Sequence, residues 1–298
     1  MKQLGTVTIA IPFYNASRTI ADAVKSVFAQ TYQDWELILI DDGSRDGSAD
    51  RVKQIQDSRV RVISDGVNCG LSARLNQIAT LANGDYLARM DADDLMHPER
   101  IARQVAFLAE NPAIDAIDTA TYTVDDDLTP LGIRGDESLD CRPESVLRNG
   151  LFIHPTMMGR TKWFRQNPYD GTYHRAEDRE LWCRTCTESK FARLVEPLFF
   201  YREALTGNLP NYLNTGKTIR KILLKYGPPL LGAWRTSVLI NKFAMRSAIY
   251  RGATALGLQG KLIRRRNRPL TQNELKTAQT IITQILETSV PGLPGPTH

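Results

Sequence analysis

Three carboxylates lie within four residues, at Asp91, Asp93 and Asp94, directly after a short apolar segment. Like charges at this spacing repel one another, so a sheltered cluster needs a cation to balance it. Mg²⁺ and Mn²⁺ prefer oxygen ligands, and a strand end that points Asp91 and Asp93 to one side, with Ala92 on the other, would supply them. The alternative is a solvated acidic turn that caps a helix beginning near Pro98.

Apolar, β-branched segments alternate with amphipathic helical segments from the N-terminus to this acidic cluster. We expect strands over residues 7–11, 35–40, 60–63 and 86–90, with helices over 15–30, 47–56 and 71–81 between them. This alternation indicates a parallel sheet with right-handed crossovers and helices on both faces. Ligands bind such sheets at the carboxyl ends of the strands, where four polar segments should converge: Pro12 to Asn15, Asp41 to Gly43, Asn68 to Gly70 and Asp91 to Asp93.

Local chemistry predicts several boundaries. Proline has no N–H to donate, so Pro12 should end the first strand, and Asn15 or Ser17 should cap the helix that follows. We expect Asp94 to serve the helix after the acidic cluster, over residues 97–110. Further on, the pattern predicts a strand within 114–122, a charged turn at 125–127, helices over 143–148 and 161–166, a strand from 154, a mobile polar loop at 169–174 and an extended segment over 194–201.

The order of these motifs resembles the inverting family 2 glycosyltransferases of the GT-A fold. The matching segments are residues 7–15, 39–48, 68–76 and 91–94, and then Glu177 and Asp178 ahead of Leu181 and Trp182. Each piece is weak alone, but five in the expected order are a strong signal. The resemblance implies an α/β fold of the GT-A type, Rossmann-like, with a mostly parallel sheet flanked by helices. Residues 1–203 would form the nucleotide-sugar-binding and catalytic domain.

The resemblance also implies a donor site. Asp93 would hold Mn²⁺ or Mg²⁺, with Asp91 alongside the ion and near the ribose. Asp41 would accept a hydrogen bond from the nucleobase edge, although Asp41 to Ser44 could equally be a plain polar turn. The other expected donor-binding residues are Pro12, Tyr14, Asn15, Asp42, Asn68, Arg74 and Ala92. For Arg74 the sequence leaves phosphate contact and a place on the protein surface equally open.

For the acceptor side, the resemblance places the general base at Asp178, with Glu177 beside it. A single displacement would invert the anomeric centre. The alternative is that both carboxylates only favour a helix N-terminus through its dipole. His154 could touch the diphosphate or the acceptor, or it could be structural.

The charge of the chain changes abruptly after residue 203. Residues 1–203 contain 24 Lys and Arg against 31 Asp and Glu, whereas residues 204–298 contain 14 against two. Basic helices over 216–226 and 234–251, and arginines at 264–266 and 268, predict a basic helical C-terminal region (204–298) with a disordered end at 291–296. Such a region suits an anionic membrane surface, although a plain solvated helical pair is the alternative. The acidic first part argues against nucleic acid.

No secretory signal, membrane-spanning run or disulfide framework is visible. We therefore expect a cytoplasmic enzyme, peripheral at the inner face of the membrane. The predicted activity is metal-dependent hexosyl transfer from a nucleoside-diphosphate sugar, most simply UDP-linked, to a hydroxyl of a glycan or lipid-linked acceptor in cell-surface polysaccharide synthesis. The alternatives are a sugar-nucleotide-binding protein without turnover, and a nucleotidyltransferase, which would ordinarily carry a Gly-rich basic loop after the first strand.

Overall fold

The computed structural model describes residues 4–203, 209–256 and 266–294. Within these ranges, nine strands form one mixed sheet in the order β3-β2-β1-β4-β8-β6-β9-β5, with β7 paired to β6. The first four strands of this order are parallel, as the strand–helix alternation predicted, and β8 joins them antiparallel. The strands are β1 (Val7–Phe13), β2 (Trp35–Asp41), β3 (Val60–Ser64), β4 (Tyr86–Arg89), β5 (Leu95–Met96), β6 (Ala116–Val124), β7 (Pro130–Arg134), β8 (Met158–Arg160) and β9 (Phe191–Arg202).

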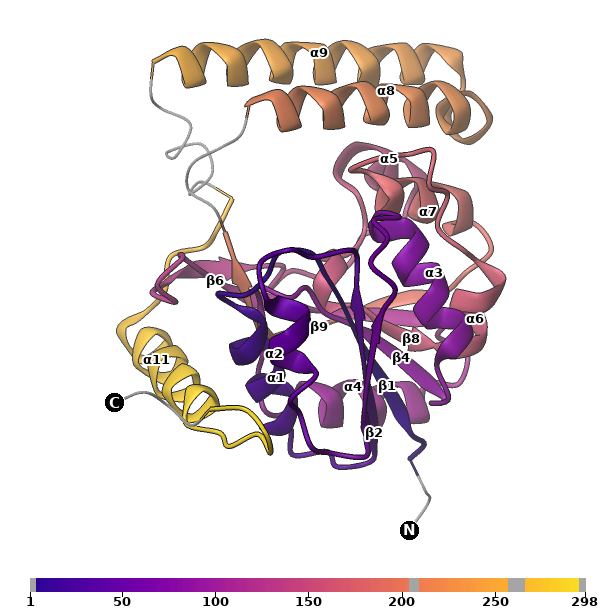
Figure 1. Cartoon of the computed structure of the whole chain (residues 1–298). Coiled ribbons are helices and arrows are strands. Elements are labelled where there is room, and N and C mark those ends of the chain that lie inside the picture. The colour runs from indigo at the N-terminus through magenta and orange to yellow at the C-terminus, as the bar shows by residue number, and fades with distance from the viewer. Residues whose placement is uncertain (1–3, 204–208, 257–265, 295–298) are drawn as a thin grey trace.

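Helices cover both faces of the sheet (Figure 1). Alternate residues of β1 face opposite cores, since Ile9 and Ile11 pack with one cluster and Ala10 with the other. The helices are α1 (Ile20–Phe28), α2 (Ser48–Val52), α3 (Leu71–Leu81), α4 (Arg100–Glu110), α5 (Pro143–Asn149), α6 (Thr161–Gln166), α7 (Glu177–Thr185), α8 (Leu209–Leu231), α9 (Ala233–Ala255) and α11 (Gln272–Leu286). The bounds predicted for α3 and α6 are confirmed.

Strand β1 does not end at Pro12, as we expected, but continues to Phe13. The carbonyl of Ala10 accepts a hydrogen bond from Met90, so Ala10 and, two residues on, Pro12 face the β4 side. The paired segment of β4 ends opposite Ala10. Proline therefore sits where the sheet no longer needs its N–H.

Helix α1 begins at Ile20, so the prediction that Asn15 or Ser17 caps it is wrong. Asn15 has a left-handed backbone, with φ of 49°. Its N–H donates to Ser44 Oγ at 2.9 Å, and its Oδ1 accepts the N–H of Arg45 at 2.9 Å. The loop after β1 is thus tied to the loop after β2, at the carboxyl edge of the sheet.

Helices α8 and α9 lie side by side above the rest of the molecule (Figure 1), and α8 packs against α5 and α7. Both are longer than predicted. Gly232, with φ of 85°, separates them in a left-handed conformation that glycine adopts readily. Leu223 and Leu239 anchor the pair to the core that α7 shares. In the described ranges, no helix is both long and apolar enough to cross a bilayer.

The chain after α9 returns to the first 203 residues. Arg268 bridges to Ile133 of β7, and α11 packs on a cluster that includes Leu95 and Phe200. The prediction of a disordered end is wrong for residues 291–294: the carbonyl of Pro291 accepts the N–H of Gln56 at 2.9 Å, and Leu293 packs on the core. Residues 264, 265, 295 and 296 of the predicted C-terminal features lie outside the described ranges.

Candidate active site

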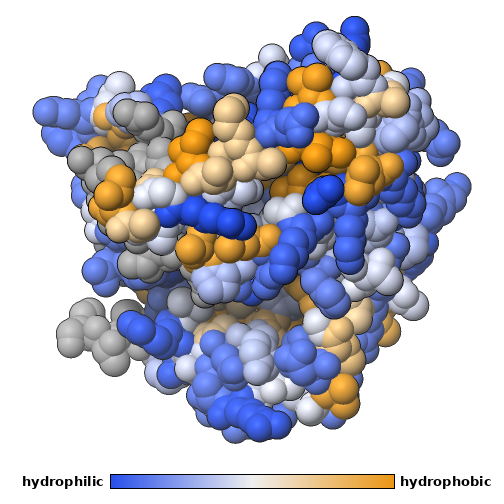
Figure 2. Space-filling view, turned by 90° about the horizontal axis from the view of Figure 1, so that it is seen from above, coloured by the Kyte–Doolittle hydropathy of each residue, from blue (hydrophilic) through white to orange (hydrophobic). Residues whose placement is uncertain are grey.

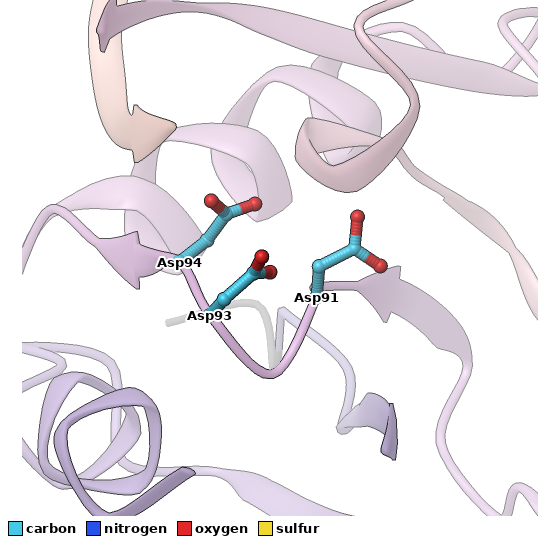
Figure 3. A group of neighbouring side chains, drawn as sticks. All are labelled: Asp91, Asp93 and Asp94. Atoms are coloured by element: carbon cyan, nitrogen blue, oxygen red, sulfur yellow. The ribbon is translucent and has the colours of Figure 1, made fainter. Parts of the chain in front are cut away.

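The three carboxylates after β4 converge in a turn, not at an extended strand end as we expected. Strand β4 stops at Arg89, and Asp91, Asp93 and Asp94 rise from the same side of the loop that follows (Figure 3). One oxygen from each lies within 4.8 Å of the others. Ala92 points away into the core, as predicted. The turn therefore presents three oxygen ligands to one point.

Asp94 belongs to this cluster and does not serve the following helix, which begins only at Arg100. Its Oδ1 accepts the backbone N–H of Arg202 at 2.7 Å, whereas its buried Oδ2 has no partner among the described residues. Burial, followed by the charges of Asp93 and Asp91, raises the pKa of Asp94 well above its ordinary value. The protein around Asp93 and the charge of Asp91 also raise the pKa of Asp93, although this residue keeps an exposed face. Repulsion and an orphaned acceptor both fit a cation.

A buried arginine stands beside the cluster. Arg89, at the end of β4, donates from Nη2 to Asp91 Oδ1 at 2.7 Å, and its Nε and Nη1 have no partner among the described residues. Burial acts to lower the pKa of Arg89, but Asp91, Tyr169, Glu177 and Asp178 outweigh it and raise that pKa. Sequence reasoning missed Arg89. The available signal was a charge inside an apolar strand, which usually means a buried partner.

Helix α7 presents Glu177 and Asp178 to two different cavities. Asp178 lines a cavity of about 700 Å³ together with His154, while Glu177 lines one of about 600 Å³ beside the start of α3. Burial raises the pKa of both carboxyls, and the charge of Asp178 raises that of Glu177 further. Asp178 Oδ1 also accepts the N–H of Arg179 at 2.7 Å. Both residues thus open a helix, and each also faces a cavity.

The segments after β2 and β3 meet around Asp41. Its buried carboxylate accepts the N–H of Ser44 at 2.9 Å and the hydroxyl of Ser64 at 2.8 Å. Gly43 has φ of 80°, and a Cβ there would come within 3.0 Å of the backbone N of Asn68. Only glycine allows the two loops to approach this closely. The predicted segments at Asp41 and Asn68 are therefore neighbours.

Arg74 lies neither on the surface nor free for phosphate. It is buried, and its Nε donates to Asp42 at 3.0 Å, while its Nη atoms donate to Asp65, Val67 and Gln77. Every N–H of the guanidinium is thereby used. Asp42 also accepts the backbone N–H groups of Cys69 and Gly70. The geometry corrects both readings of Arg74 and assigns it, with Asp42, to holding the turn that opens α3.

Comparison with known proteins decides the family. Residues 8–171 match the family described as glycosyl transferase family 2. The chain is 31% identical over 260 residues to EpsE of Bacillus subtilis strain 168, which is named as a glycosyltransferase; the match covers 80% of this chain and 92% of EpsE. The chain belongs to glycosyl transferase family 2. The predicted resemblance is confirmed.

Solved glycosyltransferase structures share the fold. Staphylococcus aureus TarS (residues 1–349) in complex with UDP-GlcNAc has a TM-score of 0.63 at 15% identity, covering 97% of this chain and 82% of that one. The mannosyltransferase PcManGT of Pyrobaculum calidifontis, in complex with GDP-Man and Mn²⁺, has a TM-score of 0.56 at 17% identity, covering 95% and 85%. The predicted GT-A fold is confirmed.

At the rim of this glycosyltransferase's sheet, Tyr14 is 53% exposed, whereas Pro12 is buried within β1. Asn68 is exposed. Of the two residues predicted to line the nucleobase pocket, Tyr14 is therefore open to solvent, and Pro12 is part of the strand just before it.

His154 opens a 3-10 turn, His154–Thr156, and not a strand as predicted. Its Nε2 lies 2.8 Å from the Tyr169 hydroxyl, and its ring is edge-on to Trp182 with centroids 6.1 Å apart. Burial, followed by the positive charge of Arg89, lowers the pKa of His154 well below its ordinary value. The imidazole is therefore neutral at pH 7, and it faces the cavity of Asp178 as a hydrogen-bonding group.

The loop over residues 169–174, which we predicted to be polar and mobile, buries two of its side chains. Tyr169 and Tyr173 are buried in the core. Asn76 exchanges two hydrogen bonds with the backbone of Tyr169, donating at 2.9 Å and accepting at 2.8 Å. The loop is therefore anchored to α3, and its exposed residues are 171, 172 and 174. Position 170 is half-buried and position 173 is in the core.

Proposed function

We propose that this family 2 glycosyltransferase transfers a hexosyl group, with inversion, from a UDP-sugar to a hydroxyl of a glycan or lipid-linked acceptor in cell-surface polysaccharide synthesis. One observation carries the proposal. An acidic cluster with an orphaned buried oxygen and a separate carboxylate of raised pKa, Asp178, both surround the buried Arg89. Donor activation and proton removal need these two kinds of group close together.

Asp93 and Asp91 would hold Mn²⁺ or Mg²⁺, with the free Oδ2 of Asp94 as a further ligand. Such an ion neutralises the negative charge that develops on a departing diphosphate. Arg89 keeps Asp91 in place through its 2.7 Å hydrogen bond. Oxygen-only ligands at a carboxylate cluster suit both ions, and the Mn²⁺ complex of PcManGT supports a divalent metal.

The donor would lie along the carboxyl edge of β1 and β2. Asp41 would accept the N–H of the nucleobase, and the exposed ring of Tyr14 would cover it above Pro12. The other donor contacts in this proposal come from Asn15, Asn68 and the backbone of Ala92, whose side chain points into the core, with Asp42 holding the loop that carries Asn68. The complex of TarS with UDP-GlcNAc supports a UDP donor.

In the proposed reaction the acceptor hydroxyl attacks the anomeric carbon from the Asp178 side. Asp178 takes the hydroxyl proton as the new carbon–oxygen bond forms. The bond from the anomeric carbon to the phosphate oxygen breaks, and its electron pair leaves with the nucleoside diphosphate. A single displacement inverts the anomeric centre. His154, neutral and in the same cavity, would orient the acceptor by hydrogen bonding.

Calorimetry of UDP binding with and without Mn²⁺ tests the donor side. We expect wild-type binding to depend on the metal, and Asp93→Ala to lose the metal-dependent part. Asp127→Ala removes a carboxylate from an exposed turn and serves as the matched control. If Asp93→Ala kept the Mn²⁺-dependent affinity for UDP, the assignment of Asp93 as a metal ligand would be wrong.

Family membership argues against a nucleotidyltransferase. A sugar-nucleotide-binding protein without turnover is the other alternative. A panel of nucleotide sugars, screened for metal-dependent hydrolysis, separates it from an enzyme, because a binding protein would retain affinity without releasing sugar.

We also propose that α8 and α9 dock on the anionic inner face of the membrane, in the cytoplasm. Seen from above the pair, apolar residues gather among polar ones (Figure 2). The exposed apolar residues of α8 and α9 include Leu224, Trp234, Met245 and Ile249, and Lys221 and Lys242 are exposed on the same helices. Basic and aromatic side chains together suit anionic lipid.

Sedimentation with phosphatidylglycerol and phosphatidylcholine vesicles tests this. We expect binding to the anionic vesicles only, weakened by salt and by Trp234→Ala. Equal binding to both lipids, or none, would contradict the proposal.

A further inference from the structure

Five arginines line a cavity of about 780 Å³ that is bordered by α8 and α9 on one side and by α5 and α7 on the other. They are Arg134, Arg148, Arg179, Arg246 and Arg266, and the described wall of this arginine cavity contains no carboxylate. Positive charges gathered in one place repel one another. The arginine cavity therefore favours an anion, as the acidic cluster favours a cation.

Most of these arginines form no ion pair with a carboxylate of the described residues. Arg134 is paired, since it donates to Glu203. Arg148 and Arg266 are exposed and have no hydrogen-bond or ion-pair partner among the described residues. Two guanidinium groups at the rim are thus available to a ligand.

Two more arginines form cation–π contacts with the same aromatic ring. The guanidinium carbon of Arg179 lies 5.2 Å, and that of Arg246 5.7 Å, from the centroid of Phe243 on α9. Arg179 donates from Nη2 to the carbonyl of Leu147 at 3.0 Å, but its buried Nε has no partner among the described residues. Burial lowers the pKa of Arg179; the nearby Cys183 and Asp178 act against this, and the charge of Arg246 adds to it. An anion between these groups would relieve the repulsion between the two guanidinium groups.

The arginine cavity also has an apolar part and a direct neighbour. Tyr212, Ile219 and Phe243 line it, so an alkyl chain can follow the anionic group. Arg134, Asn149 and Arg266 line both this cavity and the cavity that contains Asp178. A ligand that fills the arginine cavity can therefore extend directly towards the proposed base.

We infer that the arginine cavity binds the phosphate or diphosphate group of the acceptor, so that the enzyme selects a glycan linked through phosphate to an apolar chain. This inference rests on the proposed function. Guanidinium groups match phosphate geometry with paired N–H donors. The donor diphosphate belongs at the acidic cluster, so the arginine cavity is a second, separate place for phosphate. With the phosphate held there, the attached sugar lies towards Asp178.

Calorimetry in EDTA tests the inference, because without divalent metal the acidic cluster cannot attract a diphosphate. The probes are inorganic pyrophosphate, farnesyl diphosphate and farnesol. We expect wild-type protein to bind both diphosphates, farnesyl diphosphate more tightly, and farnesol weakly or not at all. The double variant R148Q/R246Q changes two exposed side chains and should lower affinity for both diphosphates at least tenfold.

The control R220Q/R251Q removes the same charge from exposed positions of α8 and α9 that lie outside the arginine cavity. We expect its diphosphate affinity to stay within about twofold of wild type. Equal losses in both double variants would overturn the inference, because general attraction to a basic surface would explain them. A loss of phosphatidylglycerol vesicle binding in R148Q/R246Q, without loss of farnesyl diphosphate binding, would also overturn it in favour of a phospholipid headgroup.

The same preparations are assayed for Mn²⁺-dependent UDP binding and for nucleotide-sugar hydrolysis. If both are absent, the proposed function fails. If both are present and R148Q/R246Q still binds diphosphates like wild type, only the inference about the arginine cavity fails. With a phosphate-linked acceptor, the double variant should raise the acceptor KM at least tenfold and leave kcat within about threefold.

Discussion

Replacing Asp178 by Asn tests the proposed chemistry most directly. The amide keeps the size of the carboxylate and an oxygen to accept the N–H of Arg179, so the start of α7 should hold. A positioned general base contributes roughly 10²–10⁴-fold to rate. Glu177, the neighbouring carboxylate, lines a different cavity and is badly placed to substitute. We therefore expect kcat for transfer to fall by about 10³–10⁴-fold, or about 4–5.5 kcal/mol in the activation barrier.

The assay is release of UDP and formation of product at saturating donor, together with calorimetry of UDP binding. Donor affinity should remain within about twofold of wild type. Burial raises the pKa of Asp178, and a base must be deprotonated, so wild-type kcat/KM should rise with pH through that raised pKa. This acid limb should be absent in Asp178→Asn. If Asp178→Asn retains more than about a tenth of wild-type kcat while Glu177→Gln loses transfer, Glu177 is the base and our reasoning is refuted.

Three further results are expected. Arg89→Gln should move the acid limb of kcat/KM to higher pH, because the charge of Arg89 lowers the pKa of Asp178; a limb that stays in place would contradict this. Arg74→Met should lower the free energy of unfolding in urea by about 3 kcal/mol, since it removes the positively charged partner of the buried Asp42 carboxylate, whereas Arg61→Met, at an exposed site, should cost under about 1 kcal/mol. Mn²⁺ at about 100 times its Kd should stabilise the wild type by about 2.7 kcal/mol in thermal unfolding, and Asp93→Ala should show no such gain.

Much of the parallel half of the sheet could be predicted from sequence, because each strand and helix there is a continuous local pattern. The failures have physical causes. Strand β7 is short and contains Pro130 and Gly132, so only its pairing with β6 defines it. Helix α11 was not among the helices that we predicted, although its signal is local. Thr271 and Glu274 form a capping box, and Ala278, Ile282 and Ile285 follow a helical spacing.

In the candidate site, too, local features could be predicted from sequence and features that depend on distant contacts could not. The spacing of Asp91 and Asp93 is local and could be read, as could the position of Asp178 at a helix start. The role of Asp94 could not, because its partner is the backbone of Arg202, 108 residues away. The same holds for Arg74, whose partners Asp42 and Asp65 come from two other strand ends. A single charged residue in a sequence does not reveal which distant atoms satisfy it.

Helix α7 connects the chemistry to the added helical pair. Its first turn carries Asp178, and the carboxylate of Glu180, two residues on in the same turn, accepts the hydroxyl of Tyr226 on α8. On the same helix, the guanidinium of Arg179 lies over Phe243 of α9. Both α8 and α9 therefore contact the helix that holds the proposed base, within two residues of it. Packed helices transmit displacement to one another. Docking of α8 and α9 on a membrane would therefore hold Asp178 and the arginine cavity at fixed positions relative to each other. An acceptor delivered from that surface would then meet a base already in position.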